Sequence, residues 1–206
     1  MSNHKWLLDA GHGGIKDGRY TTAPGKMHTF ADGLVFYEGE NNRAIVNLLA
    51  PLLDQASIEF ERVYDEQFDT LLSKRVKTAN SIFSKDRRCV YLSIHSDAMP
   101  EGAHGKGRGF TIYTSPGQTR SDEIASTFSE TYRDAFPEFK HRRDLSDGDA
   151  DKEEGFYVLR KTRCPALLIE NLFFDNRREA EFLLSVEGRK RIAGALLRSI
   201  LAVEKE

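Results

Sequence analysis

Short apolar segments of strand length alternate with longer segments of helical periodicity, and this alternation constrains the fold more than any other feature of the chain. Residues Gly39–Asp54 place their apolar side chains at spacings of three and four, as one buried helix face requires. Cys89–Ile94 is instead a β-rich run that charged residues precede and Pro100 follows. Strands that alternate with helices predict an α/β fold with a mainly parallel central sheet and helices on both faces.

The other segments continue this order along the chain. We expect strands over Trp6–Ala10, Ile58–Tyr64, Cys89–Ile94, Phe110–Tyr113 and Ala166–Ile169. We expect helices over Gly39–Asp54, Leu71–Phe83, Ser121–Phe136 and Arg177–Val203. The Gly-rich segment Met99–Arg108 and the charged segment His141–Glu154 are expected to be loops, and Arg142, Arg143 and the acidic run Asp147–Glu154 are expected to be solvated. Because no repeat or linker separates two cores, residues 1–206 are predicted to form a single domain.

Composition excludes several classes of protein. The 30 basic and 32 acidic residues give a net charge of −2, which disfavours a nucleic-acid binder that gains affinity by counterion release. No apolar run approaches the ~20 residues that a membrane span needs. The two cysteines, Cys89 and Cys164, cannot form a disulfide framework or a Cys-x-x-Cys zinc site. We expect two reduced thiols in the core, with a single bridge between them as the alternative. The first residues, Met1 to Ala10, contain no apolar export signal.

Polar side chains stand at the ends of three predicted strands. His12 follows the first strand, His95 follows Cys89–Ile94, and Glu170 follows Ala166–Ile169. In open α/β sheets, ligands bind beyond the carboxyl ends of the strands, so these groups are expected to converge. Two imidazoles with a carboxylate are what a catalytic zinc ion uses, and Glu38, at the start of a helix, can supply the carboxylate. Glu170 is then free to act on a water molecule.

Each of these residues also has a purely structural interpretation. The glycines around His12 are typical of a tight turn after a strand, although no phosphate-binding pattern follows them. His95 is compatible with a hydrogen-bonded structural histidine, and Glu38 with an acidic residue that favours the helix dipole. Glu170 is harder to explain in this way, because an unpaired carboxylate at a buried strand end costs several kcal/mol. The joint pattern therefore favours a site.

Three segments of the chain resemble motifs of the zinc-dependent N-acetylmuramoyl-L-alanine amidases, the cell-wall amidases of bacterial cell separation and of phage endolysins. Leu8–Gly14 reads LDAGHGG and resembles the opening Asp-x-Gly-His-Gly-Gly motif. Ser93–Ala98 reads SIHSDA and resembles Ser-x-His-x-Asn-Ala. Pro165–Glu170 reads PALLIE and resembles the last motif of the family. The segment from Leu72 to Asn80 resembles a family helix that we interpret as structural.

The resemblance implies a set of roles. His12, Glu38 and His95 would bind Zn²⁺, and Glu170 would be the catalytic residue. The substrate would be peptidoglycan, cleaved at the amide between N-acetylmuramic acid and L-alanine. Such an enzyme acts on the cell wall, in the periplasm or outside the cell, so export or release is expected even though no signal is visible. The sequence leaves open the oligomeric state, the stem-peptide preference and whether the chain comes from a phage or its host.

The choice of the ligand glutamate rests on the same resemblance. In the family, apolar residues follow this glutamate at seven and eleven positions. Ile45 and Leu49 fulfil this for Glu38, whereas Asn47 and Pro51 do not for Glu40. Glu38 is therefore the expected ligand, and Glu40 remains the alternative.

The sequence differs from the family motifs at two positions, and other functions are compatible with parts of it. Asp97 replaces the usual asparagine, and Leu172 stands where many members have glycine, which places substrate preference in question. His28 and His104 lie in Gly-containing segments and are expected to be loop residues, not ligands. The rival functions are another zinc peptidase or deacetylase, a non-catalytic peptidoglycan-binding domain, and a nucleotide-binding domain. The carboxylate of Glu170 disfavours the second, and the absence of a phosphate-loop lysine disfavours the third.

Overall fold

A computed structural model of the chain describes residues 2–22, 25–146 and 148–205. Met1, the first residue of the segment in which no export signal is visible, and Asp147, in the expected acidic loop, lie outside the described residues.

A six-stranded sheet forms the centre of the molecule, in the order β6-β1-β7-β10-β8-β9. Four neighbouring strands run parallel, namely β6, β1, β7 and β10. The next strand, β8, pairs antiparallel with β10. The strands of this sheet are β1 (Lys5–Ala10), β6 (Glu59–Arg62), β7 (Cys89–Asp97), β8 (Thr111–Thr114), β9 (Lys152–Glu153) and β10 (Ala166–Phe173). The mainly parallel sheet predicted from the sequence is confirmed.

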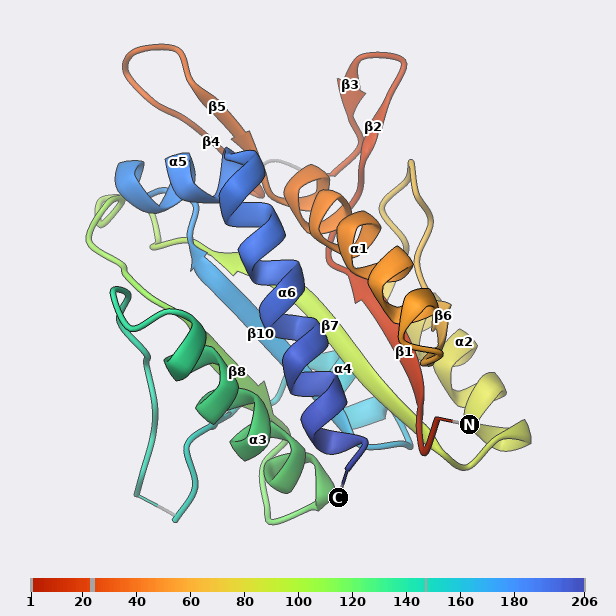
Figure 1. Cartoon of the computed structure of the whole chain (residues 1–206). Coiled ribbons are helices and arrows are strands. Elements are labelled where there is room, and N and C mark those ends of the chain that lie inside the picture. The colour runs from red at the N-terminus through yellow and green to blue at the C-terminus, as the bar shows by residue number, and fades with distance from the viewer. Residues whose placement is uncertain (1, 23–24, 147, 206) are drawn as a thin grey trace.

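Helices cover both faces of this sheet, as predicted (Figure 1). On one face, α1 and α3 pack against α6; on the other, α2 packs against α4. A further helix, α5, packs against α6 and β10. The helices are α1 (Glu38–Gln55), α2 (Leu72–Lys85), α3 (Arg120–Ala135), α4 (Tyr157–Lys161), α5 (Arg177–Leu184) and α6 (Val186–Val203).

The strands are apolar on both faces because each face is covered. Successive residues of a strand point to opposite faces. Trp6 and Leu8 of β1 accordingly join the large core beneath α1, α3 and α6, whereas Leu7 joins a smaller core beneath α2 and α4. The same alternation in β7 and β10 decides which polar side chains share a face at the ends of these strands.

Several elements differ from the sequence predictions. Arg177–Val203 is not one helix: α5 ends at Leu184, and Ser185 begins α6 by accepting a hydrogen bond from the Gly188 backbone N–H at 2.9 Å. The sequence pattern does not predict α4, β9 or the hairpins β2–β3 (Ile15–Lys16, Arg19–Tyr20) and β4–β5 (Met27–Thr29, Val35–Tyr37). These strands have two or three residues, too few to show an alternating pattern.

Three further predictions concern the two cysteines, membrane-spanning helices and the charged loop. Cys89 and Cys164 are free and buried, as predicted. Among the described residues, no helix combines the length and the apolar character needed to cross a bilayer. The charged loop, however, is not fully solvated: Asp151 is only 1% exposed, and β9 pairs with β8. That part of the loop prediction was wrong because charge alone does not reveal a strand of two residues.

Candidate active site

His12 lies in the turn that follows β1, at the carboxyl edge of the sheet. The chain passes close to β7 here: a Cβ atom on Gly11 would come within 2.1 Å of the His95 ring, so only glycine fits. His12 itself has a φ of 63°, in the left-handed region that few residues other than glycine adopt. The turn therefore directs the imidazole across the end of β7.

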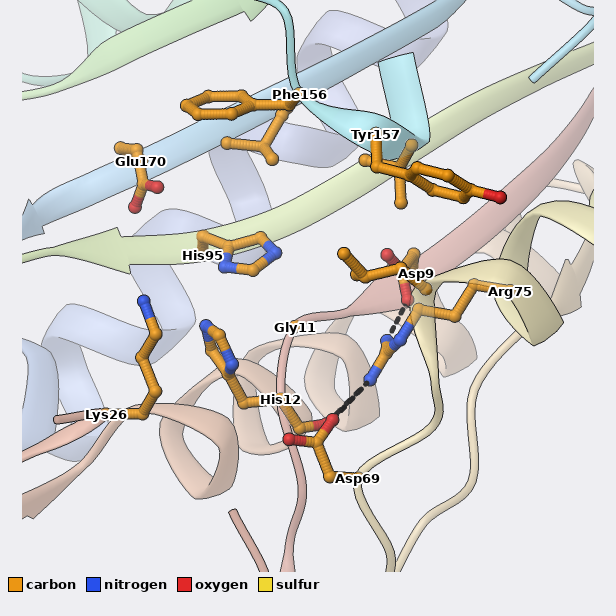
Figure 2. A pocket seen from close by; sticks show the side chains of 13 residues that line it. Asp9, Gly11, His12, Lys26, Asp69, Arg75, His95, Phe156, Tyr157 and Glu170 are labelled. Carbon is orange, nitrogen blue, oxygen red and sulfur yellow. Dashed lines mark hydrogen bonds and ion pairs between the residues drawn. The ribbon is translucent and has the colours of Figure 1, made fainter. Parts of the chain in front are cut away.

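His95 and Glu170 lie side by side because their strands are neighbours in register. His95 of β7 pairs with Glu170 of β10. Tyr91 and Leu168 belong to the core under α2 and α4, and by the period of two His95 and Glu170 point to that same face. Figure 2 shows both side chains at one pocket with His12. The convergence predicted from strand ends is observed.

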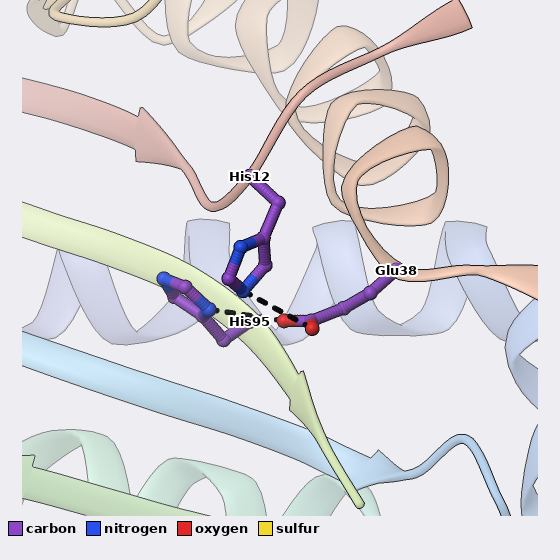
Figure 3. A group of neighbouring side chains, drawn as sticks. All are labelled: His12, Glu38 and His95. Atoms are coloured by element: carbon purple, nitrogen blue, oxygen red, sulfur yellow. Dashed lines mark hydrogen bonds and ion pairs between the residues drawn. The ribbon is translucent and has the colours of Figure 1, made fainter. Parts of the chain in front are cut away.

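Glu38, the first residue of α1, joins the two imidazoles (Figure 3). Its Oε2 lies 3.1 Å from Nε2 of His12, and its Oε1 lies 3.0 Å from Nδ1 of His95. The side chain is 2% exposed, and its Oε1 also accepts a hydrogen bond from the Ser96 N–H. Glu40 is not part of this cluster among the described residues.

Burial and neighbouring charges shift the pKa values of Glu38, His95 and the adjacent Glu170. Burial alone would raise the pKa of Glu38, but His12 and His95 outweigh it and hold the pKa well below its usual range. Burial lowers the pKa of His95, although Glu38 partly opposes this. Burial and the nearby charges of Glu38 and Asp97 raise the pKa of Glu170 well above 4.5. A carboxylate and two imidazoles thus face a carboxyl group that holds its proton unusually firmly.

The chemistry of the donors fits a zinc ion. His12, Glu38 and His95 each offer one ligand atom, and these atoms all lie within 4.8 Å of one another. Two imidazole nitrogens and one carboxylate oxygen match a catalytic zinc site with one coordination position left for water. Among the described residues this is the only group of three such side chains that close together. Glu170 stands beside it with a buried Oε2 that has no hydrogen-bond partner in the described chain.

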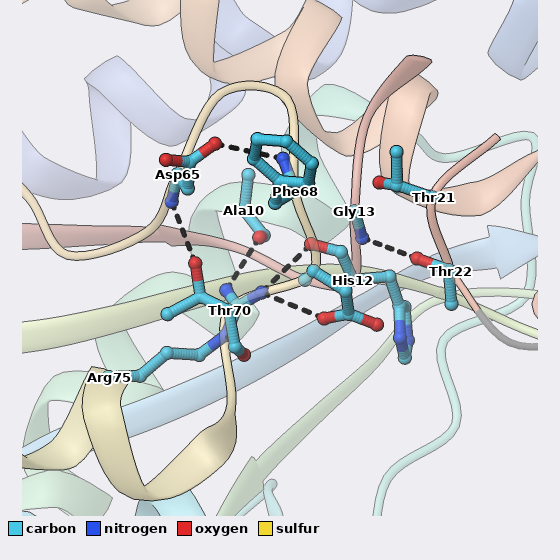
Figure 4. A network of polar contacts seen from close by, with 12 residues as sticks. Ala10, His12, Gly13, Thr21, Thr22, Asp65, Phe68, Thr70 and Arg75 are labelled. Atoms are coloured by element: carbon cyan, nitrogen blue, oxygen red, sulfur yellow. Dashed lines mark hydrogen bonds and ion pairs between the residues drawn. The ribbon is translucent and has the colours of Figure 1, made fainter. Parts of the chain in front are cut away.

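Two arginines behind the cluster were not singled out by the sequence analysis. Arg43 of α1 and Arg75 of α2 each donate a hydrogen bond of 2.8 Å to the backbone carbonyl of His12. Figure 4 shows the Arg75 bonds to this carbonyl and to that of Ala10. The segment Leu72–Asn80, which we interpret as structural, contacts the backbone of the candidate ligand His12 through Arg75. Arg75 shares a helix face with Leu72 and Ala79, which is a signal in the sequence, whereas Arg43 lies off the apolar face of its helix and gives no such signal.

Asp9 holds the Arg75 side chain in place. It forms an ion pair with Arg75 and accepts hydrogen bonds from the hydroxyls of Tyr91 at 2.6 Å and Ser93 at 2.8 Å. Burial would raise the pKa of Asp9, but Arg75 and Tyr91 outweigh it and lower the pKa. Asp9 therefore balances the positive charge of the buried Arg75 guanidinium. The other N–H groups of Arg75 donate to the backbone carbonyls of the turn that carries His12.

Other residues discussed for the sequence lie outside the cluster. The rings of His28 and His104 are 5.1 Å apart and contact each other, away from the three candidate ligands. Arg142, expected to be solvated, donates to Asp97 at 2.9 Å and lies over the Phe173 ring. The difference arises because Asp97, where the family motif has asparagine, provides a charge for it to pair with.

Two curated proteins are similar to this chain over most of its length. The chain is 34% identical over 185 residues to the N-acetylmuramoyl-L-alanine amidase CwlM of Bacillus licheniformis, covering 88% of this chain and 61% of that protein. It is 28% identical over 186 residues to the endolysin of Bacillus phage SPP1, covering 89% of this chain and 59% of that protein. The chain therefore spans about three fifths of the length of these curated relatives.

Solved structures show the same fold. An N-acetylmuramoyl-L-alanine amidase of Clostridium difficile 630 has a TM-score of 0.80 and 22% identity, with 100% of this chain and 99% of that chain covered. The amidase AmiC2 of Nostoc punctiforme has a TM-score of 0.76 and 24% identity, with 99% and 98% covered. The profile of a family described as N-acetylmuramoyl-L-alanine amidase matches residues 7–202. With nearly its whole length matched, this chain belongs to the N-acetylmuramoyl-L-alanine amidase family.

Proposed function

We propose that this chain is a zinc-dependent amidase that hydrolyses the bond between N-acetylmuramic acid and L-alanine in peptidoglycan. The observation that carries the proposal is the approach of His12, Glu38 and His95 within 4.8 Å, beside the buried carboxyl of Glu170. Family membership supports the same reaction. The names of the two curated relatives, an amidase and an endolysin, support a substrate in the cell wall.

In this proposal, His12, Glu38 and His95 are the metal ligands. Zinc would supply Lewis acidity, lowering the pKa of a water in its open position to near 7. Glu38 is held in place by the first turn of α1 and by the Ser96 N–H, so it presents both oxygens to the imidazoles. The hydrogen bonds from Arg43 and Arg75 hold the turn that carries His12.

Glu170 is proposed as the general base and then the general acid. Its Oε2 is buried and without a partner in the described chain, so it is free to accept a proton from water. Burial raises the pKa of this carboxyl, which favours its holding the proton taken from water until the leaving amine accepts it. Because burial is the largest cause of that raised pKa, the strand end itself prepares Glu170 for this role.

The proposal extends to the whole chain and its place of action. Residues 1–206 would form one catalytic domain, acting on the cell wall in the periplasm or outside the cell. Peptidoglycan is its partner, and neither a nucleic acid nor a membrane is required.

Metal analysis combined with product analysis tests this function. The purified protein should contain one zinc ion, lose activity to a chelator and regain it with zinc. Mass spectrometry of digested peptidoglycan should show free stem peptides and intact glycan chains. Products cut within the peptide would instead identify a peptidase, and loss of acetate would identify a deacetylase. Zinc binding without any product would leave only a peptidoglycan-binding role.

A further inference from the structure

Two cavities meet at the candidate active site. One, which we call the aromatic cavity, has a volume of about 210 Å³ and is shown in Figure 2. The other, which we call the loop cavity, has a volume of about 330 Å³ and extends toward Met99 and Pro100. Lys26, His95 and Glu170 line both of them. The reactive groups therefore stand at the junction of two separate spaces.

This arrangement suits an amide with a bulky group on each side. If the proposed function holds, the scissile carbonyl must lie at the junction, next to His95 and Glu170. One substituent then enters each cavity. The chemical character of the walls decides which substituent goes where.

The wall of the aromatic cavity that α4 and the start of α2 form is apolar and solvent-exposed. Phe156 and Tyr157, at the start of α4, are 38% and 39% exposed, and Leu72 of α2 is 53% exposed. Phe156 is held by Tyr113, whose ring lies edge-on with centroids 5.3 Å apart. Exposed aromatic rings beside a reactive cluster are a feature of ligand sites and not of ordinary surface.

The loop cavity has a polar wall instead. Ser96, Asp97 and Glu38 line it, together with the backbone that leads from β7 into the Gly-rich loop. Ser96 is only 2% exposed, so its hydroxyl lies behind this wall. The carboxylate of Asp97, whose side chain is 26% exposed, is the group of this wall that can accept a hydrogen bond from a peptide N–H of a ligand.

We propose that the sugar ring of N-acetylmuramic acid binds in the aromatic cavity and the stem peptide binds in the loop cavity. One face of a pyranose ring presents C–H groups, which pack against the electron-rich face of an aromatic ring. A peptide carries an amide donor and acceptor at every residue, and each must find a partner when it is buried. This orientation rests on the proposed amidase function and adds to it the residues that distinguish the two halves of the substrate.

A pair of soluble substrates tests the orientation. N-acetylmuramoyl-L-alanyl peptide and D-lactoyl-L-alanyl peptide share the scissile amide and the peptide, and only the first has the sugar ring. For zinc-loaded Phe156→Ala and Tyr157→Ala, kcat/KM on the muramoyl peptide should fall about fivefold to tenfold, mainly through KM. On the lactoyl peptide it should change less than about twofold. The matched control is Val186→Ala, an exposed apolar residue that lines neither cavity and is 69% exposed.

Asp97→Ala provides the complementary measurement. Both substrates carry the peptide, so this variant should lower kcat/KM for both by the same factor and leave their ratio unchanged. An equal loss on both substrates for Phe156→Ala, or a change in peptide-length preference, would overturn the orientation while the amidase function stands. If the zinc-loaded wild type cleaves neither substrate nor peptidoglycan, the proposed function itself fails and the orientation with it.

Discussion

The backbone of His12 is held in an uncommon conformation by groups from two helices. A φ of 63° costs a residue with a side chain on the order of 1–2 kcal/mol, so the surroundings must stabilise it. Arg43 and Arg75 do this by donating to the same carbonyl oxygen. Arg43 also donates to the carbonyls of Glu66 at 2.9 Å and Asp65 at 2.7 Å, which ties the turn to the β6–α2 loop.

We expect Arg43→Lys to weaken zinc binding about 10–100-fold while the protein stays folded. A lysine keeps the charge but has no planar fork, so it cannot bond all of these carbonyls at once. Competition with a chromophoric chelator measures the affinity, and circular dichroism measures folding. Arg62→Lys is the control, since Arg62 is an exposed partner of Glu66. Unchanged zinc affinity in Arg43→Lys would show that the arginine has no positioning role.

Glu170→Gln should separate chemistry from metal binding. The amide keeps the shape of the side chain and removes the base, so zinc should stay bound while kcat falls about 10²–10⁴-fold. His95→Ala should lose both zinc and activity. Zinc content by mass spectrometry and release of stem peptides give the two readouts. Loss of zinc in Glu170→Gln would mean that Glu170 is a ligand.

Three of the four predicted helices match α1, α2 and α3 within two residues at each end, and each predicted strand of the sheet is present. Strands β1, β7 and β10 were predicted because both faces are buried, which leaves continuous apolar runs. The helical pattern from Arg177 onward was read as continuous because Ser185 interrupts it without a glycine or proline. The cap of α6 depends on backbone angles that periodicity does not report.

Replacing Ser185 by alanine should destabilise the protein by about 1 kcal/mol. Its hydroxyl accepts from the Gly188 N–H at 2.9 Å and donates to the Phe182 carbonyl at 2.7 Å, so it joins the end of α5 to the start of α6. Urea unfolding gives the change in stability. Ser185→Asp retains an acceptor at the cap and should recover part of the loss; equal stability of wild type and Ser185→Ala would rule out the capping role.

The site itself was predictable only as far as strand ends and motifs reach. The approach of His12, Glu38 and His95 follows from their places at the edge of the sheet. The roles of Arg43 and Phe156 were not predicted because their partners, His12 and Tyr113, are distant in sequence. No feature of the neighbouring sequence indicates these contacts. Leu172 was noted as a replacement for glycine; its φ of 64° explains the family's preference, and burial in the core compensates for the side chain here.

At the scale of the whole molecule, a buried acidic pair near β9 makes stability depend on pH. Burial raises the pKa of Asp151 from 3.8 to about 7, and the charges of Asp149 and Asp122 add to this. Its Oδ2 accepts a hydrogen bond from Thr114 at 2.6 Å. The folded protein thus holds a proton that the unfolded chain releases between about pH 4 and pH 7.

Stability should therefore fall as pH rises through this window. The contribution of Asp151 is complete below its unfolded pKa and lost above about pH 7. Asp151→Asn should remove this part of the slope and raise stability at pH 8 by on the order of 2 kcal/mol. Urea titrations at pH 4.5, 6 and 8 measure it, with the exposed Asp134→Asn on α3 as the control. A variant with the wild-type slope would contradict the assignment.

Hydrogen bonds of Glu204 join the two ends of the described chain. Its carboxylate accepts hydrogen bonds from the Trp6 indole N–H at 3.1 Å and from the His4 N–H at 3.1 Å, and its carbonyl accepts one from the Asn3 side chain at 2.8 Å. Both ends lie where β1 begins, whereas His12 lies beyond the end where β1 finishes. A short peptide joining residues 205 and 2 would span little distance, so new termini opened in an exposed loop should yield a circular permutant. For the same reason, immobilising the protein on a bead by either end would leave the pocket facing the solution.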